Sequence, residues 1–316
     1  MILRQHGGPD AQGAMPFDFS TNANACGPCP QALEAVRQAD AVRYPDPALT
    51  QLRAALADFH GVAVERIVPA ASASEFIFRI TAWAARRGVR EVALPVHAYG
   101  DYGHAAAAWG LTVAPVAPLA WACEPSSPLG QPEPKERAMH GAMVVLDRAY
   151  EPLRLSGECS FDPSALDRMW QLWSPNKALG LTGVRGAYAI APADCATAEL
   201  EALAPSWPLG GHGLAMLLAW CEAPVQQWLE QSRATLREWK ARQLVLCRDL
   251  GWTAQPSDAN FFVASIPNLS AALPALRRRG LQLRDCASFG LPGQARLSVQ
   301  PPRVQDALAA AWKEIT

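Results

Sequence analysis

Short apolar segments alternate with amphipathic segments through the first two-thirds of the sequence, and this alternation constrains the fold more than any other feature. Residues 89–94 (VREVAL), 142–146 (AMVVL) and 187–190 (AYAI) have the length and composition of strands. Residues 75–85 (EFIFRITAWAA) carry apolar side chains at helical spacing. Strands that alternate with helices pair in parallel, because each helix carries the chain back along the sheet. The pattern therefore predicts an α/β fold with a mostly parallel central sheet flanked by helices.

The sequence changes character after Pro205. Two helical patterns cover residues 214–220 and 225–249. Segments of strand length follow at residues 259–264, 281–284 and 295–299, before a helical pattern that closes the chain. We therefore predict a large α/β domain over residues 30–204, and a smaller α+β domain that combines an N-terminal arm, residues 1–29, with residues 205–316.

The charge and the cysteine content argue against several classes of protein. The chain has 28 Lys and Arg against 29 Asp and Glu, a formal net charge of −1, which does not suit a nucleic-acid or membrane partner. Eight cysteines in 316 residues are too few for a disulfide scaffold, and Cys26 and Cys29 lack a second pair at zinc spacing. The N-terminus has no apolar signal segment. We expect a cytoplasmic protein with reduced cysteines and no metal site.

A lysine in a small, apolar, glycine-rich segment is the sharpest local signal for chemistry. Lys177 stands between Trp173 and Leu181, with Gly180 and Gly183 close by. Most lysines lie on solvated surfaces, so a lysine in such surroundings is expected to be partly desolvated. Desolvation favours the neutral amine that can form a Schiff base. The alternative is a surface lysine whose stem lies along apolar neighbours.

Two further segments have the properties of ligand-binding positions. Asp147 ends the apolar run of residues 142–146, where it can hold a protonated pyridine nitrogen or cap the next turn. Small residues around Ala73 and Ser74 precede an apolar helix, whose N-terminus favours anions, although Ser74 can equally be an N-cap. A Schiff-base lysine, a carboxylate and an anion-binding helix terminus together predict a site for pyridoxal 5′-phosphate (PLP).

Several short motifs, taken in order, resemble the fold-type I PLP-dependent enzymes of the class I and II aminotransferase family. The similar branch holds histidinol-phosphate aminotransferase and L-threonine-O-3-phosphate decarboxylase. The matching segments are residues 18–24 (DFSTNAN), 43–46 (RYPD), 99–102 (YGDY), 147–150 (DRAY), 295–299 (ARLSV), and the S-x-x-K-x-x-x-x-x-G-x-R pattern over residues 174–185. The resemblance covers nearly the whole chain.

The resemblance implies a role for each matching residue. Lys177 would carry the cofactor, Asp147 would pair with its ring nitrogen, and Tyr150 with its 3′-oxygen. Tyr99 would stack on the ring. Residues implied near the cofactor phosphate are Ala73, Ser74, Ser174, Arg185 and, from the partner subunit of a homodimer, Tyr44. Arg296 would bind the α-carboxylate of the substrate, and Asn24 lies in the N-terminal substrate segment.

Two segments favour the decarboxylase branch within this resemblance. His6-Gly7-Gly8 is typical of its N-terminus, and residues 284–293 (RDCASFGLPG) resemble its C-terminal segment. In that branch, His6 and Arg284 would hold the substrate phosphate, which suits the bidentate donors of an arginine. The implied reaction is the decarboxylation of L-threonine O-3-phosphate to (R)-1-amino-2-propanol O-2-phosphate, in cobalamin biosynthesis. The alternative is a transaminase similar to histidinol-phosphate aminotransferase.

One loop departs from the family's pattern. Residues 124–130 (EPSSPLG) take the place of N-P-N-N-P-T-G, so Ser127 replaces an Asn that would donate to the cofactor 3′-oxygen. A hydroxyl is shorter than an amide and can require a bridging water. The segments around Gly130 are also shorter than usual. These differences predict altered tuning of the cofactor or, as a third alternative, a degraded relative with weak activity.

Overall fold

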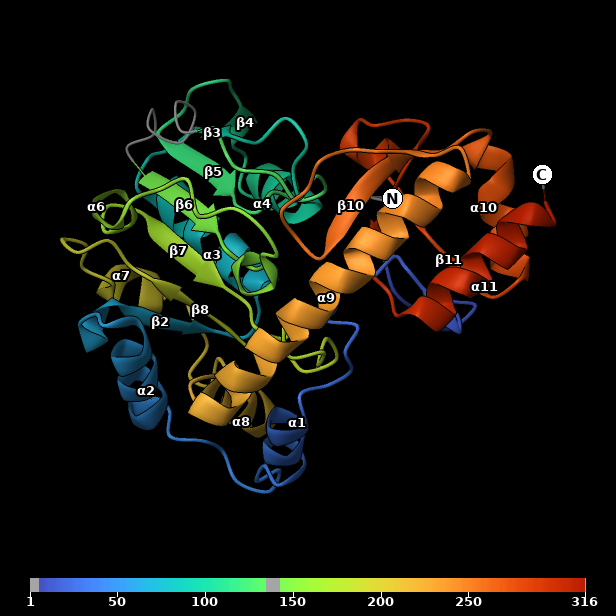
Figure 1. The fold of residues 1–316 in the computed structure, drawn as a ribbon. Coiled ribbons are helices and arrows are strands. Elements are labelled where there is room, and N and C mark those ends of the chain that lie inside the picture. The colour runs from blue at the N-terminus through green and yellow to red at the C-terminus, as the bar shows by residue number, and fades with distance from the viewer. Residues whose placement is uncertain (1–5, 135–142, 316) are drawn as a thin grey trace.

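The computed structural model describes residues 6–134 and 143–315, and its centre is a seven-stranded sheet with the order β2-β8-β7-β6-β5-β3-β4 (Figure 1). The strands are β2 (Ile67–Ala70), β3 (Glu91–Ala93), β4 (Thr112–Val113), β5 (Leu119–Cys123), β6 (Met143–Asp147), β7 (Trp170–Trp173) and β8 (Ala187–Ile190). From β7 to β4 neighbouring strands pair in parallel, and β8 is antiparallel to both its neighbours. The predicted α/β fold with a mostly parallel sheet is confirmed.

Helix α3 (Ala73–Arg86) covers the middle of this sheet. It contacts β2, β7 and β8, and also α4 (Gly100–Ala108). Phe76, Ile77 and Ile80 of α3 are fully buried, because the apolar stripe that the sequence shows at helical spacing faces the strands. They share one core cluster with Trp121 of β5 and Trp170 of β7.

A second group of helices packs near β2 and β8. It consists of α1 (Pro30–Arg37), α2 (Thr50–His60) and α8 (Gly211–Trp220), which lie together in Figure 1. Their apolar residues form one cluster with Ile67 of β2 and Tyr188 of β8. Leu229 and Leu236, from the first half of the long helix α9 (Ala223–Asp249), belong to the same cluster.

A smaller sheet, with the order β12-β13-β10-β9, lies at the other end of α9 (Figure 1). Its strands are β9 (Thr253–Ala254), β10 (Phe261–Ser265), β12 (Arg284–Asp285) and β13 (Gln294–Ser298). α10 (Leu269–Arg278), α11 (Pro302–Lys313) and the end of α9 form a core with it. β1 (Phe17–Asp18) pairs in parallel with β11 (Leu281–Gln282), so the N-terminal arm joins this part of the chain.

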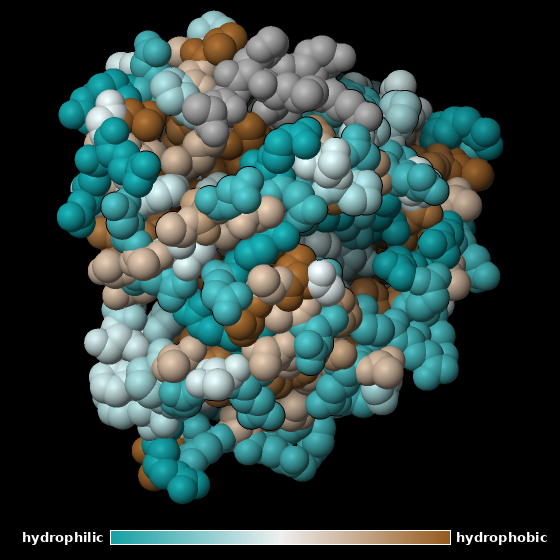
Figure 2. Space-filling view, turned by 90° about the vertical axis from the view of Figure 1, so that its left-hand side faces the viewer, coloured by the Kyte–Doolittle hydropathy of each residue, from teal (hydrophilic) through white to brown (hydrophobic). Residues whose placement is uncertain are grey.

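The remaining elements are short: α6 (Pro163–Leu166), α7 (Ala198–Glu201) and the 3-10 turns η1 (Val64–Arg66), η2 (Glu151–Leu153) and η3 (Ala287–Phe289). Within residues 6–134 and 143–315, no helix combines the length and the apolar character that a membrane span needs. On the face shown in Figure 2, hydrophobic residues are scattered among hydrophilic ones.

The division of the chain at residue 204 stays a prediction. α8 packs against α1 and α2 beside the large sheet, and α9 runs from that group of helices to the small sheet. α9 therefore connects the two parts of the molecule as one continuous helix.

Candidate active site

A cavity of about 550 Å³ lies where the carboxyl ends of β5, β6 and β7 meet residues of β12 and β13. Cys123 and Asp147 end β5 and β6, and Ser174 directly follows β7, so the cavity is at the edge of the sheet where α/β folds place ligands. Twelve of the fourteen predicted site residues line it: His6, Ala73, Ser74, Tyr99, Ser127, Asp147, Tyr150, Ser174, Lys177, Arg185, Arg284 and Arg296. Tyr44 and Asn24 do not.

Lys177 is placed by a tightly packed loop after β7. Its backbone carbonyl accepts from the Asn24 N–H at 2.9 Å, and the Leu179 carbonyl accepts from the Cys29 N–H at 2.8 Å. Gly180 has a φ of +67°, and a Cβ there would meet the Gly27 carbonyl oxygen at 2.7 Å. The loop is thus fixed against residues 24–29, and it directs the Lys177 ammonium over the Tyr150 ring, 5.1 Å from the ring centre.

Asp147 is buried at the end of β6 and both of its carboxylate oxygens accept hydrogen bonds. Oδ2 accepts from the Tyr102 hydroxyl at 2.7 Å, and Oδ1 from the Ala149 N–H at 2.9 Å. Burial raises the pKa of Asp147, and the Tyr102 and Ala149 donors oppose that rise. A cationic partner in the cavity would favour the charged carboxylate. This contact of Tyr102 was not predicted, although the tyrosine ends the YGDY motif.

The N-terminus of α3 opens into the cavity. Ser72 is its N-cap, since its Oγ accepts from the Glu75 N–H at 3.0 Å. The alternative that Ser74 is the N-cap is therefore wrong, and Ser74 lines the cavity together with Ala73. Ser174 and Arg185 line the same cavity. A helix N-terminus with hydroxyl and guanidinium donors is a site for an anion such as a phosphate.

Aromatic and amide groups form another part of the lining. Tyr99 is the N-cap residue of α4, and its hydroxyl donates to Asp101 Oδ2 at 2.9 Å. Tyr150 accepts at its hydroxyl from Asn22 Nδ2 at 3.2 Å. Asn22 is buried, and its Oδ1 has no hydrogen-bond partner among the residues that the structure describes. Asn22 was not predicted as a site residue, and its motif, DFSTNAN, is the signal that could have found it.

Two arginines lie side by side on neighbouring strands of the small sheet. Arg284 of β12 and Arg296 of β13 are register partners, and both are more than nine-tenths buried. Arg284 donates to the Ser288 Oγ at 2.8 Å, and Arg296 donates to the Ser127 Oγ at 3.3 Å. Burial, followed by the charge of Arg296, lowers the pKa of Arg284. Like charges directly opposite each other are destabilising, so this pair indicates a site that gains stability from a bound anion.

Three predicted residues lie at the rim of the cavity or outside its lining. His6 is exposed at the rim, with its ring centre 6.1 Å from that of Tyr99. Asn24 is buried outside the lining, where its Nδ2 donates to the Ala178 carbonyl at 3.0 Å, so it supports the Lys177 loop. Tyr44 is 78% exposed and stacks on Trp207 with ring centres 4.3 Å apart. Its predicted role at a partner's phosphate stays a prediction.

The residues present fit PLP. Among the described residues that line the cavity, Asp147 is the only carboxylate, against Lys177, Arg185, Arg284 and Arg296. The cavity volume of about 550 Å³ is that of a small-molecule site. The unpartnered Asn22 oxygen beside Tyr150 is the kind of buried polar atom that a bound group would satisfy. No group of three or more metal-ligating side chains occurs within residues 6–134 and 143–315.

Two solved structures are similar to this protein in their overall fold. Histidinol-phosphate aminotransferase from Sinorhizobium meliloti, in complex with pyridoxal-5′-phosphate, superposes with a TM-score of 0.77 at 23% identity, over 93% of this chain and 89% of that one. L-threonine-O-3-phosphate decarboxylase from Porphyromonas gingivalis gives a TM-score of 0.73 at 19% identity, over 89% of this chain and 91% of that one. These likenesses show the fold-type I architecture of PLP-dependent enzymes.

Sequence comparison then gives the family. The model of the family "Aminotransferase class I and II" matches residues 122–311, and the chain belongs to this family. A relative named histidinol-phosphate aminotransferase, from Symbiobacterium thermophilum, is 28% identical over 94% of this chain and 90% of its own length. The resemblance predicted from the motifs is confirmed, and so is PLP as the cofactor that suits the chain.

Proposed function

We propose that the cavity binds PLP through Lys177 and acts on a small amino compound that carries a phosphate group. The observation that carries this proposal is the shared lining of one cavity by Lys177, Asp147 and the Arg284–Arg296 pair. Asp147 would hold the ring nitrogen, Tyr150 and Ser127 would face the 3′-oxygen, and Tyr99 the ring. Ala73, Ser74, Ser174 and Arg185 would hold the phosphate. When bound, PLP supplies an electron sink beside the α-carbon of the substrate.

Amino transfer of the histidinol-phosphate type is the reaction that the relatives favour. The named relative from Symbiobacterium thermophilum matches nearly the whole chain, and its name gives this activity. In such a reaction, the amine of Lys177 would move the proton at the α-carbon. The buried guanidinium groups of Arg284 and Arg296 would hold the phosphate of one substrate and the carboxylates of the other.

Decarboxylation of L-threonine O-3-phosphate is the second candidate, and a specific observation favours it. Arg284 and Arg296 are register partners on adjacent strands, so their guanidinium groups can bind two anionic groups of one short molecule. Threonine phosphate carries a carboxylate and a phosphate on neighbouring carbons. His6, which lines the cavity, would add a donor to the phosphate. The two reactions differ in the bond that breaks at the α-carbon: the bond to hydrogen in amino transfer, and the bond to the carboxylate in decarboxylation. The arginines would decide between them through the orientation in which they hold the substrate.

One experiment with two products separates these candidates. The purified protein is given PLP and either L-threonine O-3-phosphate, with CO₂ followed, or L-histidinol phosphate and 2-oxoglutarate, with glutamate followed. Glutamate formation supports the transferase, and CO₂ release supports the decarboxylase. PLP binding with neither product would contradict both candidates and favour a degraded relative. A Lys177→Ala variant, which lacks the amine, is the control for each product.

We also propose a homodimer. Tyr44 and Trp207 form an exposed aromatic stack, and Val42 beside them is 93% exposed. Exposed apolar groups of this kind are typical of surfaces that a partner covers. The proposal predicts a dimer by sedimentation, with a weaker association when Trp207 is changed to Ser, and a monomer that binds PLP fully would contradict it. The cytoplasmic location stays a prediction.

A further inference from the structure

The loop of residues 124–131 begins with a fully buried carboxylate. Glu124 is 0% exposed, and it stands where the resemblance has an asparagine. Its Oε1 accepts from Arg154 Nη2 at 3.0 Å and from the Ser160 N–H at 2.7 Å, and its Oε2 accepts from the Glu133 N–H at 3.1 Å. A buried charge is costly unless it is paired and hydrogen-bonded, and Glu124 meets both conditions.

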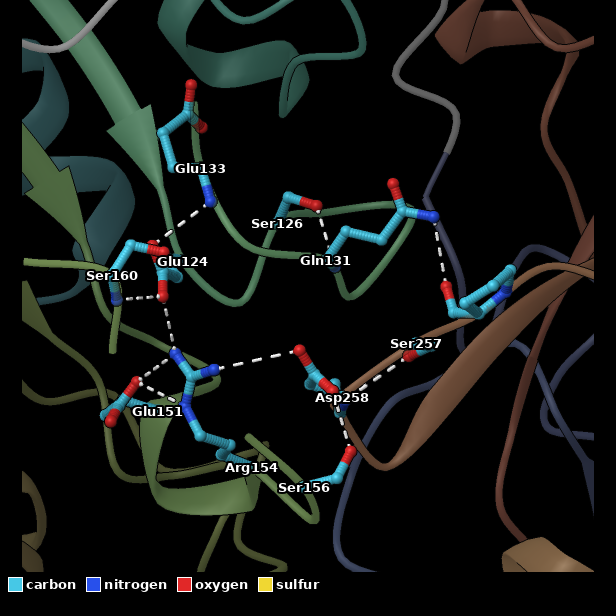
Figure 3. A network of polar contacts seen from close by, with 12 residues as sticks. Glu124, Ser126, Gln131, Glu133, Glu151, Arg154, Ser156, Ser160, Ser257 and Asp258 are labelled. Atoms are coloured by element: carbon cyan, nitrogen blue, oxygen red, sulfur yellow. Dashed lines mark hydrogen bonds and ion pairs between the residues drawn. The ribbon is translucent and has the colours of Figure 1, made fainter. Parts of the chain in front are cut away.

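Arg154 links this carboxylate to two others (Figure 3). Its Nη2 lies 2.8 Å from Glu151 Oε2, and its Nη1 lies 4.0 Å from Asp258 Oδ2. Arg154 itself is 8% exposed. The three carboxylates come from three segments: the end of β5, the turn η2, and the connection between β9 and β10. One buried guanidinium therefore lies between the two sheets, with hydrogen bonds to Glu124 and Glu151 on the side of the large sheet and a longer ion pair to Asp258 on the side of the small one.

Hydrogen bonds hold the 124–131 loop against the β9–β10 connection. The Asp258 N–H donates to the Gly130 carbonyl at 2.6 Å, and the Gln131 side chain donates to the Pro256 carbonyl at 3.0 Å. Gly130 has a φ of +71°, and a Cβ there would meet the Ser257 Oγ at 2.2 Å. Figure 3 shows the loop and the connection side by side at these contacts. The position of the loop thus depends on the same segment that contains Asp258.

The loop contains a side chain of the cavity. Ser127 lines the cavity, and its Oγ accepts from Arg296 Nη1 at 3.3 Å. Arg296 also donates to the Ser20 carbonyl at 3.1 Å, so Ser127 is one of the two hydrogen-bond acceptors that its guanidinium has among the described residues, beside the rings of Phe261 and Phe289. A displacement of the loop would remove one of these two contacts.

We propose that Arg154 is a positioning residue, which, with Glu124 and Asp258, holds the 124–131 loop against the small sheet and so orients Arg296 for a substrate anion. The effect on the loop is independent of the reaction. The effect on the substrate rests on the proposed function. Glu124, which departs from the family's asparagine, is then a matched part of an ion-pair network.

Hydrogen–deuterium exchange of the protein without substrate tests the effect on the loop. The variant is Arg154→Met, and Arg66→Met is the matched control, because Arg66 is also largely buried and pairs with Asp167 at 2.9 Å. In Arg154→Met we expect exchange at least about tenfold faster in residues 124–131 and 255–260, where the amides of Gly130 and Asp258 are bonded. Equal exchange in Arg154→Met and the unchanged protein would overturn the proposal.

A second variant covers the case in which Arg154→Met fails to fold. The double variant Glu124→Gln/Arg154→Met removes both charges, and replacing a buried pair by neutral groups is often tolerated. It should show the same faster exchange, and Arg154→Lys should restore part of the protection. A double variant with unchanged protection of residues 124–131 would also overturn the proposal.

Kinetics with the reactive substrate, either threonine phosphate or histidinol phosphate, tests the effect on Arg296. We expect KM to rise about five- to tenfold in Arg154→Met, while kcat and PLP affinity change by less than about twofold, because the loss is in ground-state binding. Arg66→Met should leave KM unchanged. Faster exchange with an unchanged KM would overturn the substrate part alone. Absence of turnover in the unchanged protein would contradict the proposed function, while the exchange result still decides the loop.

Discussion

At the scale of single residues, the charge of the cavity is set by one carboxylate and several cations. Each carboxylate oxygen of Asp147 accepts a hydrogen bond, one from the Tyr102 hydroxyl and one from the Ala149 N–H. Tyr102 is fully buried and stacks on Trp121, with ring centres 4.4 Å apart, so its hydroxyl has a fixed direction. The proton affinity of Asp147 therefore depends on a tyrosine that does not line the cavity.

Changing Tyr102 to Phe should raise the pKa of Asp147 further. The hydroxyl donates to the charged carboxylate, and its loss disfavours the charged form by about 1 kcal/mol, which raises the pKa of Asp147. The carboxyl-carbon resonances of the apoprotein measure this, with Asp147→Asn to assign the signal. Tyr188→Phe is the control, because that buried hydroxyl bonds to His60 and Trp220 instead. The same Asp147 titration in Tyr102→Phe as in the unchanged protein would refute the claim.

Changing Arg284 to Met should weaken the use of a phosphorylated substrate. The buried guanidinium supplies bidentate donors to an anion, so we expect kcat/KM to fall by about 10²- to 10³-fold. PLP affinity should stay within about twofold, because Arg284 is on the small sheet and Lys177 on the loop after β7. Steady-state kinetics and a PLP titration measure the two quantities. A large loss of PLP affinity with little loss of kcat/KM would place Arg284 at the cofactor instead.

The sequence predicts individual site residues where a motif is local, and it fails where partners are distant in the chain. Lys177, Asp147 and Arg185 have recognisable neighbours, and all three line the cavity. The Tyr102–Asp147 and Asn22–Tyr150 bonds join residues 45 and 128 positions apart. Nothing in a local pattern shows which distant groups will meet, so both bonds had to come from the structure.

At the scale of elements, the loop after β7 is the part that places Lys177 in the cavity. The carbonyls of Lys177 and Leu179 accept from residues 24 and 29, and Gly180 lies in close contact with Gly27. The loop therefore has its position only when the N-terminal arm is packed against it.

Changing Gly180 to Ala should disturb this loop. An alanine at a φ of +67° is strained, and its Cβ would approach the Gly27 carbonyl oxygen at 2.7 Å. We expect the free energy of unfolding to fall by about 1–3 kcal/mol, and PLP binding to weaken. Urea unfolding and a PLP titration measure these effects. Gly183→Ala is the matched control, since nothing lies within 4 Å of a Cβ there, and equal stability of the two variants would contradict the account.

The sequence predicts elements well where apolar spacing is regular. The helix predicted from residues 75–85 and the strand from residues 142–146 correspond to α3 and β6. β2, β5 and β7 were not predicted, because β2 contains Pro69, β5 is five residues between prolines, and β7 is two tryptophans around a polar and an apolar residue. α10 contains Pro274 in its interior, which normally argues against a helix. Pairing with neighbouring strands overrode these local signals in β2, β5 and β7, and packing of its apolar residues into the core of the small sheet did so in α10.

At the scale of the whole molecule, a partly buried histidine makes stability depend on pH. His60 is the last residue of α2, and its Nε2 and the Tyr188 hydroxyl form a hydrogen bond of 2.8 Å. Tyr188 belongs to the cluster between the helices and the large sheet. Burial, with a smaller contribution from Arg148, lowers the pKa of His60 to about 4. The unfolded chain therefore takes up a proton near pH 6.5 that the folded protein does not.

Stability should fall as the pH is lowered through this range. Since the unfolded state binds more protons between pH 6.5 and 4, we expect His60 to cost about 2 kcal/mol of stability on going from pH 7.5 to pH 5, and nothing above pH 7.5. Urea unfolding at both pH values measures this. His60→Gln keeps a polar partner for Tyr188 but does not titrate in this range. Between pH 7.5 and pH 5, its free energy of unfolding should therefore fall by about 2 kcal/mol less than that of the unchanged protein. An equal loss in both proteins would show that His60 is not the cause.

We propose that PLP becomes attached to Lys177, and reduction of the attached group followed by mapping of its position tests this proposal. The protein is incubated with PLP, reduced with sodium borohydride and digested, and the modified peptide is located by mass spectrometry. We predict one dominant label on Lys177, and its loss when an excess of the reactive substrate is present before reduction. Labelling of other lysines, with the same amount of bound PLP in Lys177→Ala, would contradict it.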